Sequence, residues 1–156
     1  MEPWERALWE AHVGVWRSRY VLYDASGNIL DRHEARSDIA LDWVANQYAQ
    51  RNIYTRNGAV EVRRYAGRFE GSRLLIEGEQ LTGAAWPVDR RVILLHFRLK
   101  EGPTETFELI TLGDPGRRAR VMQHLVAGRM TGVTAVFDEE RISSTPAIDA
   151  RGNDLA

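Results

Sequence analysis

The chain has 156 residues, and its 21 Lys and Arg side chains against 22 Asp and Glu give a formal net charge of −1. Such a balance does not favour nucleic acid as a partner, because that affinity rests on a strong positive field. Hydrophobic residues make up 44% of the chain and charged residues 28%, which is typical of a folded globular domain. The chain contains no cysteine, so disulfides, thiolate metal ligands and a cysteine nucleophile are excluded.

The sequence holds no apolar run of about 18 residues, the length that a membrane-spanning helix needs. The amino terminus lacks the basic and apolar regions of a signal peptide. We therefore expect a protein that does not insert into a membrane and that resides in the cytoplasm.

The first expected element is a helix over Glu2–Val13. Pro3 suits a first helical position, and Gly14 supplies the left-handed residue that ends a helix. Trp4 and Leu8 fall on one stripe at helical spacing, so the helix should lie against apolar surface.

From Val15 onward apolar and polar side chains alternate, which is the period of β-strands, and turn residues separate the segments. In the second strand this alternation places Arg36 and Asp38 on the solvent side. The strands expected after the first one are Ile29–Leu41, Gln47–Arg56, Ala59–Tyr65, Arg73–Ala84, Arg91–Lys100, Glu105–Leu112, Arg118–Val126 and Thr131–Ile142.

Strands joined by short connections, with no helical crossover, form an antiparallel meander that closes to remove its edges. The fold class is therefore all-β: an up-and-down barrel of about eight to ten strands whose amino-terminal helix closes one end. One barrel domain should span residues 1–143. Residues 144–156 are small and polar, and we expect a flexible tail there.

The first strand begins with Gly14-Val15-Trp16 directly after the short helix. This resembles the G-x-W start of calycins, the superfamily of lipocalins and fatty-acid-binding proteins. The later Arg117-Arg118 and Glu139-Glu140-Arg141 resemble features of lipocalin-like bacterial proteins. In calycins an arginine of the last strand often packs over the tryptophan ring, so the resemblance implies a structural latch between Trp16 and Arg141.

The resemblance also implies an internal cavity that is open at one end. Relatives carry small apolar ligands, attach bilins to proteins, or act as cofactor-free cyclases and isomerases, and the fold does not choose among these functions. The glycine cluster and late histidine of haem-binding nitrobindins are absent from the sequence.

Side-chain parity predicts a polar cluster inside the barrel. A hairpin turning at Ala25–Asn28 places Tyr20 opposite His33, and the next turn brings Tyr54 opposite His33. A histidine with phenol neighbours is a competent proton-transfer group, so Tyr20, His33 and Tyr54 are the candidate catalytic residues. The competing interpretation is a buried histidine that has a structural role alone.

Amide side chains supply the candidate ligand contacts. Buried amides need partners, which a ligand carbonyl or hydroxyl group would provide, although the amides can also bond one another or water. The candidate ligand-binding residues are Tyr48, Gln50, Asn52, Gln80 and Gln123, on the expected inward faces of their strands, and Trp86 at the mouth.

The remaining histidines offer no metal site. His96 should face outward, and neither His12 nor His124 is spaced with carboxylates as a metal ligand would be. No glycine-rich phosphate loop precedes a helix, so we expect neither a metal nor a nucleotide cofactor, and no cofactor of another kind.

The leading hypothesis is a cofactor-independent cyclase or isomerase acting on a small, largely apolar metabolite, polyketide-like or terpenoid-like. His33 would carry the proton, while Gln50 and Asn52 would hold a developing oxyanion. The alternatives are a non-catalytic carrier or sensor of such a ligand, and a chaperone-like or chromophore-attaching protein that works through its outer surface. Apolar outward residues such as Val92 and Leu94 suit a homodimer.

Overall fold

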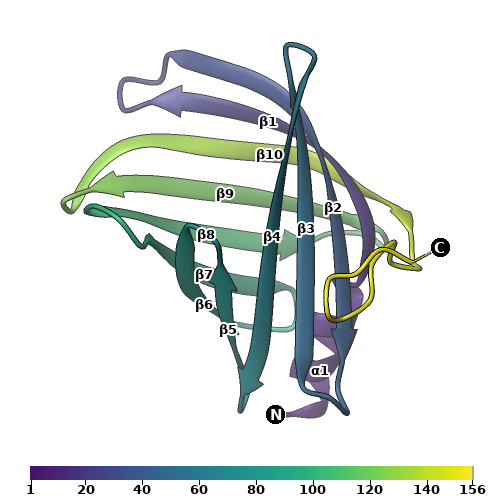
Figure 1. The fold of residues 1–156 in the computed structure, drawn as a ribbon. Coiled ribbons are helices and arrows are strands. Elements are labelled where there is room, and N and C mark those ends of the chain that lie inside the picture. The colour runs from purple at the N-terminus through teal and green to yellow at the C-terminus, as the bar shows by residue number, and fades with distance from the viewer. Residues whose placement is uncertain (156) are drawn as a thin grey trace.

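The structure is a computed structural model that describes residues 1–155, and Ala156 lies outside the described residues. One helix, α1 (Pro3–Ala11), precedes ten strands (Figure 1). The strands are β1 (Gly14–Asp24), β2 (Ile29–Asp42), β3 (Gln47–Arg56), β4 (Ala59–Glu70), β5 (Arg73–Gly78), β6 (Leu81–Pro87), β7 (Val92–Leu99), β8 (Thr104–Leu112), β9 (Arg117–Val126) and β10 (Arg129–Ser143).

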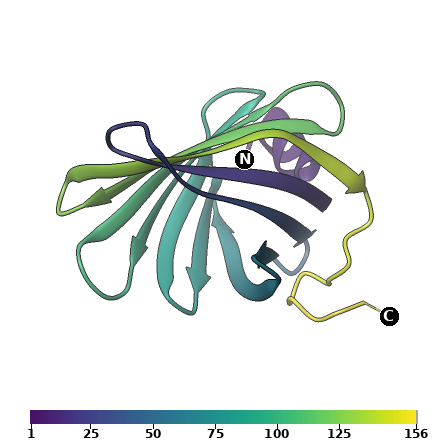
Figure 2. The same ribbon diagram turned by 90° about the horizontal axis from the view of Figure 1, so that it is seen from above.

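Each strand pairs antiparallel with its sequence neighbours, and β10 pairs with β1, so the sheet closes on itself. Figure 2 shows the strands curving round in this closed order. The predicted all-β, up-and-down barrel with a short amino-terminal helix is confirmed. None of the helical residues described makes a helix long and apolar enough to cross a membrane. Residence in the cytoplasm stays a prediction.

The stretch predicted as one strand over Arg73–Ala84 is in fact two strands, β5 and β6, with a turn at Glu79 and Gln80. The prediction was wrong because apolar alternation runs on through the turn, where Gly78 is the one residue of turn type. β4 also continues beyond the predicted Tyr65 to Glu70. The structure therefore has one strand more than the pattern indicated.

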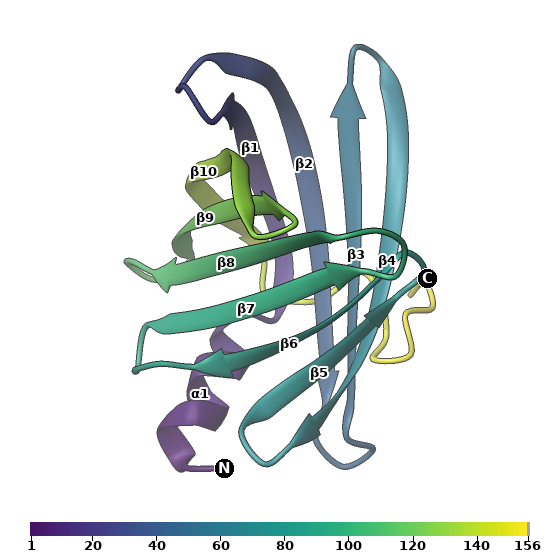
Figure 3. The same ribbon diagram turned by 90° about the vertical axis from the view of Figure 1, so that its left-hand side faces the viewer.

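The helix α1 packs at one end of the barrel, the lower end in Figures 1 and 3. Leu8 and Trp9 are buried in the main core, and the Trp9 ring meets the Phe69 ring edge-on at 5.4 Å. The Trp16 indole, which is fully buried, donates a hydrogen bond of 2.9 Å to the His12 carbonyl oxygen and so ties the helix end to β1. This end of the barrel is thus filled with aromatic side chains.

The C-terminal segment, residues 144–155, lies along the outer face of β2 and β3. Ile148 is 1% exposed and packs on Ala40 and Ala49. Asp38, expected in water, is instead fully buried beside the Arg51 guanidinium, with Nε to Oδ2 at 2.8 Å. That expectation was wrong because a sheet face is solvent-exposed only where nothing covers it. The flexibility of the tail stays a prediction.

Candidate ligand-binding site

The barrel encloses a cavity of about 270 Å³ that extends from α1 toward the opposite end of the strands. One wall comes from β5, β6, β7 and Ile110 of β8, and it is apolar because the inward residues there are aliphatic or aromatic. Its members are Leu74, Ile76, Leu81, Ala85, Ile93, Leu95, Phe97, Leu99 and Ile110. The wall can accommodate the hydrocarbon part of a ligand but offers it no polar partner.

A ladder of hydrogen bonds runs along the inward face of β3. Tyr48 Oη donates to Gln50 Oε1 at 2.6 Å, Gln50 Nε2 donates to Asn52 Oδ1 at 2.9 Å, and Asn52 Nδ2 donates to Tyr54 Oη at 3.0 Å. All four side chains line the cavity, as predicted from parity. The amides bond one another, so the ladder stands without a ligand, and their role as ligand contacts stays a prediction.

A cluster of buried charges lies between β8, β9 and β10. Glu139 accepts hydrogen bonds from Arg118 Nε, from Arg120 Nη2 at 3.1 Å, and from the Ser18 hydroxyl group. Arg120 Nη1 also donates to Glu108 Oε1 at 3.1 Å. The cluster consists of Glu108, Arg118, Arg120 and Glu139, and each of these four residues is at most 5% exposed.

Local backbone geometry brings Glu139 to the inside. Val136 is fully buried, so strict alternation would place Glu139 on the outer face. The register of β10 against β9 shifts between Val136 and Glu139, where Asp138 has a φ of 53°. This bulge inserts an extra residue and turns the Glu139 side chain inward.

Opposite charges decide the ionisation of Glu139. Burial by itself would raise the pKa of Glu139, but the Arg120 and Arg118 guanidinium groups outweigh it and hold the pKa at about 2. Burial also raises the pKa of Glu108, and there Arg120 opposes the effect only in part. The buried cluster therefore contains one firmly ionised carboxylate, Glu139, and one, Glu108, that takes up a proton more readily.

His12, at the end of α1, joins the cluster through Arg118, whose Nη1 lies 2.9 Å from His12 Nδ1. Burial, followed by the charge of Arg118, lowers the pKa of His12 well below its usual range. His12 is therefore neutral near pH 7. Nothing in the sequence distinguished it from a histidine at an exposed helix end.

The candidate catalytic residues lie together, but only two of them line the cavity. The rings of Tyr20 and His33 stack at 4.9 Å, and Tyr54 meets each of them edge-on at 5.8 Å. Tyr20 is opposite His33 as predicted, whereas Tyr54 is opposite Ala35, so the predicted second register was wrong by two residues. Tyr20 and Tyr54 line the cavity, and His33 does not.

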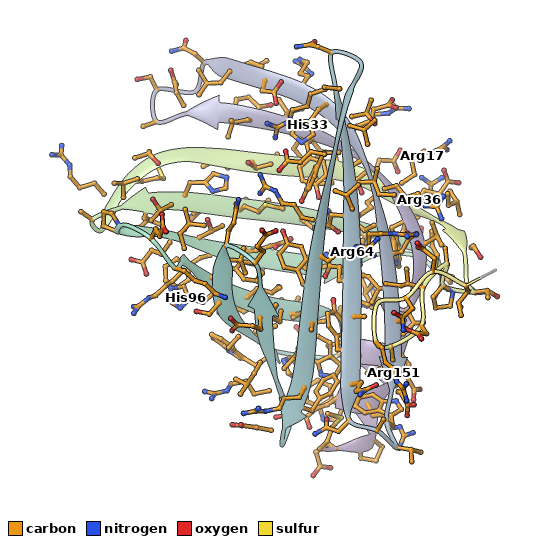
Figure 4. The ribbon with its side chains drawn as sticks, viewed as in Figure 1. Arg17, His33, Arg36, Arg64, His96 and Arg151 are labelled. Carbon is orange, nitrogen blue, oxygen red and sulfur yellow. The ribbon has the colours of Figure 1, made fainter. Side chains whose placement is uncertain are left out.

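His33 lies near the end of the barrel remote from α1 (Figure 4). Its Nδ1 is 2.8 Å from Asp31 Oδ2, and its Nε2 is 3.4 Å from Arg56 Nη2. Burial lowers the pKa of His33, and the hydrogen bond to Asp31 works against this effect. Both ring nitrogens thus face protein side chains, which leaves His33 poorly placed to exchange a proton with a ligand.

Three other predicted ligand residues lie away from the cavity. Gln80 is exposed in the turn between β5 and β6. Gln123 is exposed because β9 presents Met122 and His124 to the inside, so the predicted parity of β9 was wrong. Trp86 follows the inward Ala85 and points to the outer side of β6, so it does not line the mouth.

The predicted contact between Trp16 and Arg141 is present, but it is the weaker of two. The Arg141 guanidinium carbon lies 5.7 Å from the centre of the indole ring, whereas that of Arg118 lies at 4.0 Å. Arg118 thus supplies the closer cation–π contact while also binding Glu139. The role of Trp16 and Arg141 as a latch stays a prediction.

Sequence reasoning missed Glu108, Arg118, Arg120 and Glu139. A charged residue on a strand usually marks the solvent side, and β9 offers Ala119 and Val121 on its other face as plausible core residues. The available signal was the spacing Arg118-x-Arg120 on one strand face with acidic residues on both neighbouring strands. His124 was missed in the same way. Its Nε2 lies 2.7 Å from Thr134 Oγ1, and its side chain lines the cavity.

His96 faces outward as predicted (Figure 4). Its ring stacks on that of Phe107 with ring centres 4.3 Å apart. Within residues 1–155, no group of three or more His, Asp or Glu side chains is arranged to hold a metal ion.

No protein-family model and no curated protein matches the chain. The solved structures that share its fold include the following two. A protein of unknown function from the DUF3598 family of Nostoc punctiforme has a TM-score of 0.68 and 18% identity, over 86% of this chain and 49% of its own. The chain thus spans about half the length of that protein.

The second structure is the S-type phycobiliprotein lyase CPES from Guillardia theta. It has a TM-score of 0.68 and 13% identity, over 87% of this chain and 91% of its own. At these identities the likeness establishes the barrel fold alone. Membership of the calycin superfamily stays a prediction.

Proposed function

We propose that this protein binds a small, largely apolar molecule inside the barrel, as a carrier or sensor. The observation that carries the proposal is the cavity of about 270 Å³ with two unlike walls. Aliphatic and aromatic side chains of β5 to β8 form one wall, and the tyrosines, amides and buried charges form the other. Such a combination of apolar surface and a few polar groups is typical of small-molecule sites.

Unsatisfied polar atoms give a second reason. Arg120 Nε and His12 Nε2 are buried and have no hydrogen-bond partner within residues 1–155. A buried donor without a partner costs about 1–3 kcal/mol, which a ligand acceptor would recover on binding. The two donors therefore favour an occupied cavity over an empty one.

A cyclase or isomerase remains the second candidate, and Glu108 is the observation that favours it. Glu108 lines the cavity, and burial raises its pKa, which is a property of general acids and bases. In this version Glu108, rather than His33, would carry the proton, with Tyr20 and Tyr54 orienting the substrate. Chromophore attachment to a partner protein and a homodimer through the outer face have no support beyond the shared fold.

The binding proposal is tested with a matched pair of substitutions on β7. Leu95 lines the cavity, and the neighbouring Leu94 points to the outer side of the barrel. Titration of the neutral fluorophore Nile red should show saturable binding to the wild type. Leu95→Trp should weaken the binding at least tenfold, about 1.4 kcal/mol, because the indole fills the cavity. Leu94→Trp should leave the affinity unchanged.

Absence of saturable binding, or equal weakening by both variants, would overturn the proposal. If binding is confirmed, mass spectrometry of a molecule retained through native purification would separate the carrier from the enzyme. Conversion of that molecule by the wild type and not by Glu108→Gln would establish an enzyme, whereas unchanged release would favour a carrier.

A further inference from the structure

We infer that the cavity selects a neutral ligand head that accepts hydrogen bonds, such as a ketone or ester carbonyl group, over the matching carboxylate. The inference rests on the proposed function and names the ligand class for the same cavity. It rests on two observations. Two buried N–H donors at the cluster have no hydrogen-bond partner among the described residues, and the formal charges of the cluster cancel.

The first unused position is Arg120 Nε. The two terminal nitrogens of this guanidinium are engaged, Nη1 with Glu108 Oε1 and Nη2 with both Glu139 Oε1 and the Tyr20 hydroxyl oxygen. The Nε–H group has no partner within residues 1–155, although the residue is only 4% exposed and lines the cavity. A guanidinium has donors only, so a ligand must supply an acceptor here.

The second unused position is His12 Nε2. Because Arg118 can only donate, the contact between Arg118 Nη1 and His12 Nδ1 requires Nδ1 to accept. The neutral ring therefore carries its proton on Nε2, and this atom is buried without a partner among the described residues. Both unused positions are thus donors, on two residues that line the same cavity.

The charges of the cluster are already balanced. Two guanidinium groups, Arg118 and Arg120, face two carboxylates, Glu108 and Glu139, and the formal charges cancel. The other ionised residues of the cavity wall are paired as well: Arg63 Nε lies 2.6 Å from Glu61 Oε1, and Glu105 Oε2 lies 3.5 Å from Arg98 Nε.

A carboxylate head would therefore bring an uncompensated negative charge into a buried region that already contains two carboxylates. Desolvation of that charge would not be repaid, because each arginine is already neutralised. A carbonyl oxygen satisfies the same N–H donors and adds no charge. The cluster should thus favour the neutral head even though it is rich in arginine.

The test compares two molecules of the same shape, decanoate and its methyl-ketone counterpart undecan-2-one. Each competes with Nile red for the wild-type protein near neutral pH. We expect undecan-2-one to bind at least tenfold more tightly than decanoate. Equal affinities, or tighter binding of decanoate, would overturn the inference while leaving the proposed binding function intact. If neither molecule nor Nile red binds, the proposed function itself is wrong.

A charge-removing variant supplies the mechanism-specific readout. Glu108→Gln keeps the acceptor for Arg120 Nη1 but leaves the cluster with one excess positive charge. We expect it to raise the affinity for decanoate relative to undecan-2-one at least tenfold. Glu77→Gln removes the same charge from the exposed outer face of β5 and should leave the ratio unchanged. An unchanged ratio in Glu108→Gln would contradict the inference, and the wild-type ratio decides it if this variant does not fold.

Discussion

At the scale of single residues, Glu139 organises the interior of the barrel. It receives hydrogen bonds from Ser18 on β1 and from Arg118 and Arg120 on β9, so it joins three strands through one carboxylate. A buried ion cluster of this kind adds little stability when complete, but removal of one member leaves the remaining charges buried without a partner. We therefore expect the stability of the fold to be especially sensitive to substitution of Glu139.

Glu139→Gln should lower the free energy of unfolding by about 3–5 kcal/mol, because it leaves two buried guanidinium groups against one carboxylate. The adjacent Glu140→Gln is the matched control, since Glu140 is partly exposed and pairs with Arg17 at the surface. Glu140→Gln should lower the free energy of unfolding by less than about 1 kcal/mol. Urea unfolding of both variants makes the measurement, and equal losses would show that the buried cluster is no more sensitive than a surface ion pair.

At the scale of elements, the joint between α1 and β1 depends on Gly14. Its φ is +124°, a region that side chains disfavour, and an added Cβ would collide with the Ser143 carbonyl oxygen of β10. Trp16 and His12 are tied together across the same joint. The helix can close the barrel only if the chain turns sharply and approaches β10 here.

Gly14→Ala should therefore destabilise the protein more than Gly27→Ala. Gly27 also has a positive φ, +86°, but no atom lies within 4 Å of its added Cβ. Both variants place alanine at a positive φ, but only Gly14→Ala adds the collision with Ser143, which should cost a further amount of about 1–3 kcal/mol. Thermal unfolding compares them, and a smaller loss for Gly14→Ala would mean that the joint relaxes freely.

At the scale of the whole molecule, the cavity has an apolar wall, made mainly by β5 to β7, and a polar wall that includes the buried titratable groups Glu108 and His12. Burial lowers the pKa values of His12, His33 and His124 below the ordinary value of 6.5. The unfolded chain thus binds more protons than the folded protein as the pH falls through that value. Glu139 adds a loss of stability at lower pH, from 4.5 toward 2. Glu108, with its raised pKa, has the opposite effect.

The melting temperature should therefore fall between about pH 7 and pH 5 by several degrees. His12→Gln should show a smaller fall, because the amide can accept from Arg118 and does not titrate. Differential scanning calorimetry at both pH values makes the comparison. An identical fall of the melting temperature in His12→Gln would mean that His12 takes up no proton on unfolding between these two pH values.

Much of the architecture followed from local pattern alone. Alternation from Val15 onward and short turns sufficed to predict a closed antiparallel barrel, because a meander has no other way to remove its edges. The first hairpin register, with Tyr20 opposite His33, followed from the tight turn that sets it. The amide ladder on β3 was located by the same parity argument, since one face of that strand carries no charge.

Only the tertiary structure decided which polar groups are inside. Alternation separates the two faces of a strand but does not say which face is internal when both carry apolar residues, as in β9. Arg118 and Arg120 are inside because Glu108 and a bulge-displaced Glu139 reach them from the neighbouring strands. Asp38 is buried beside Arg51, whose guanidinium also binds Asp154 of the distant C-terminal segment. These outcomes depend on charge partners far apart in the chain, which sequence spacing does not contain.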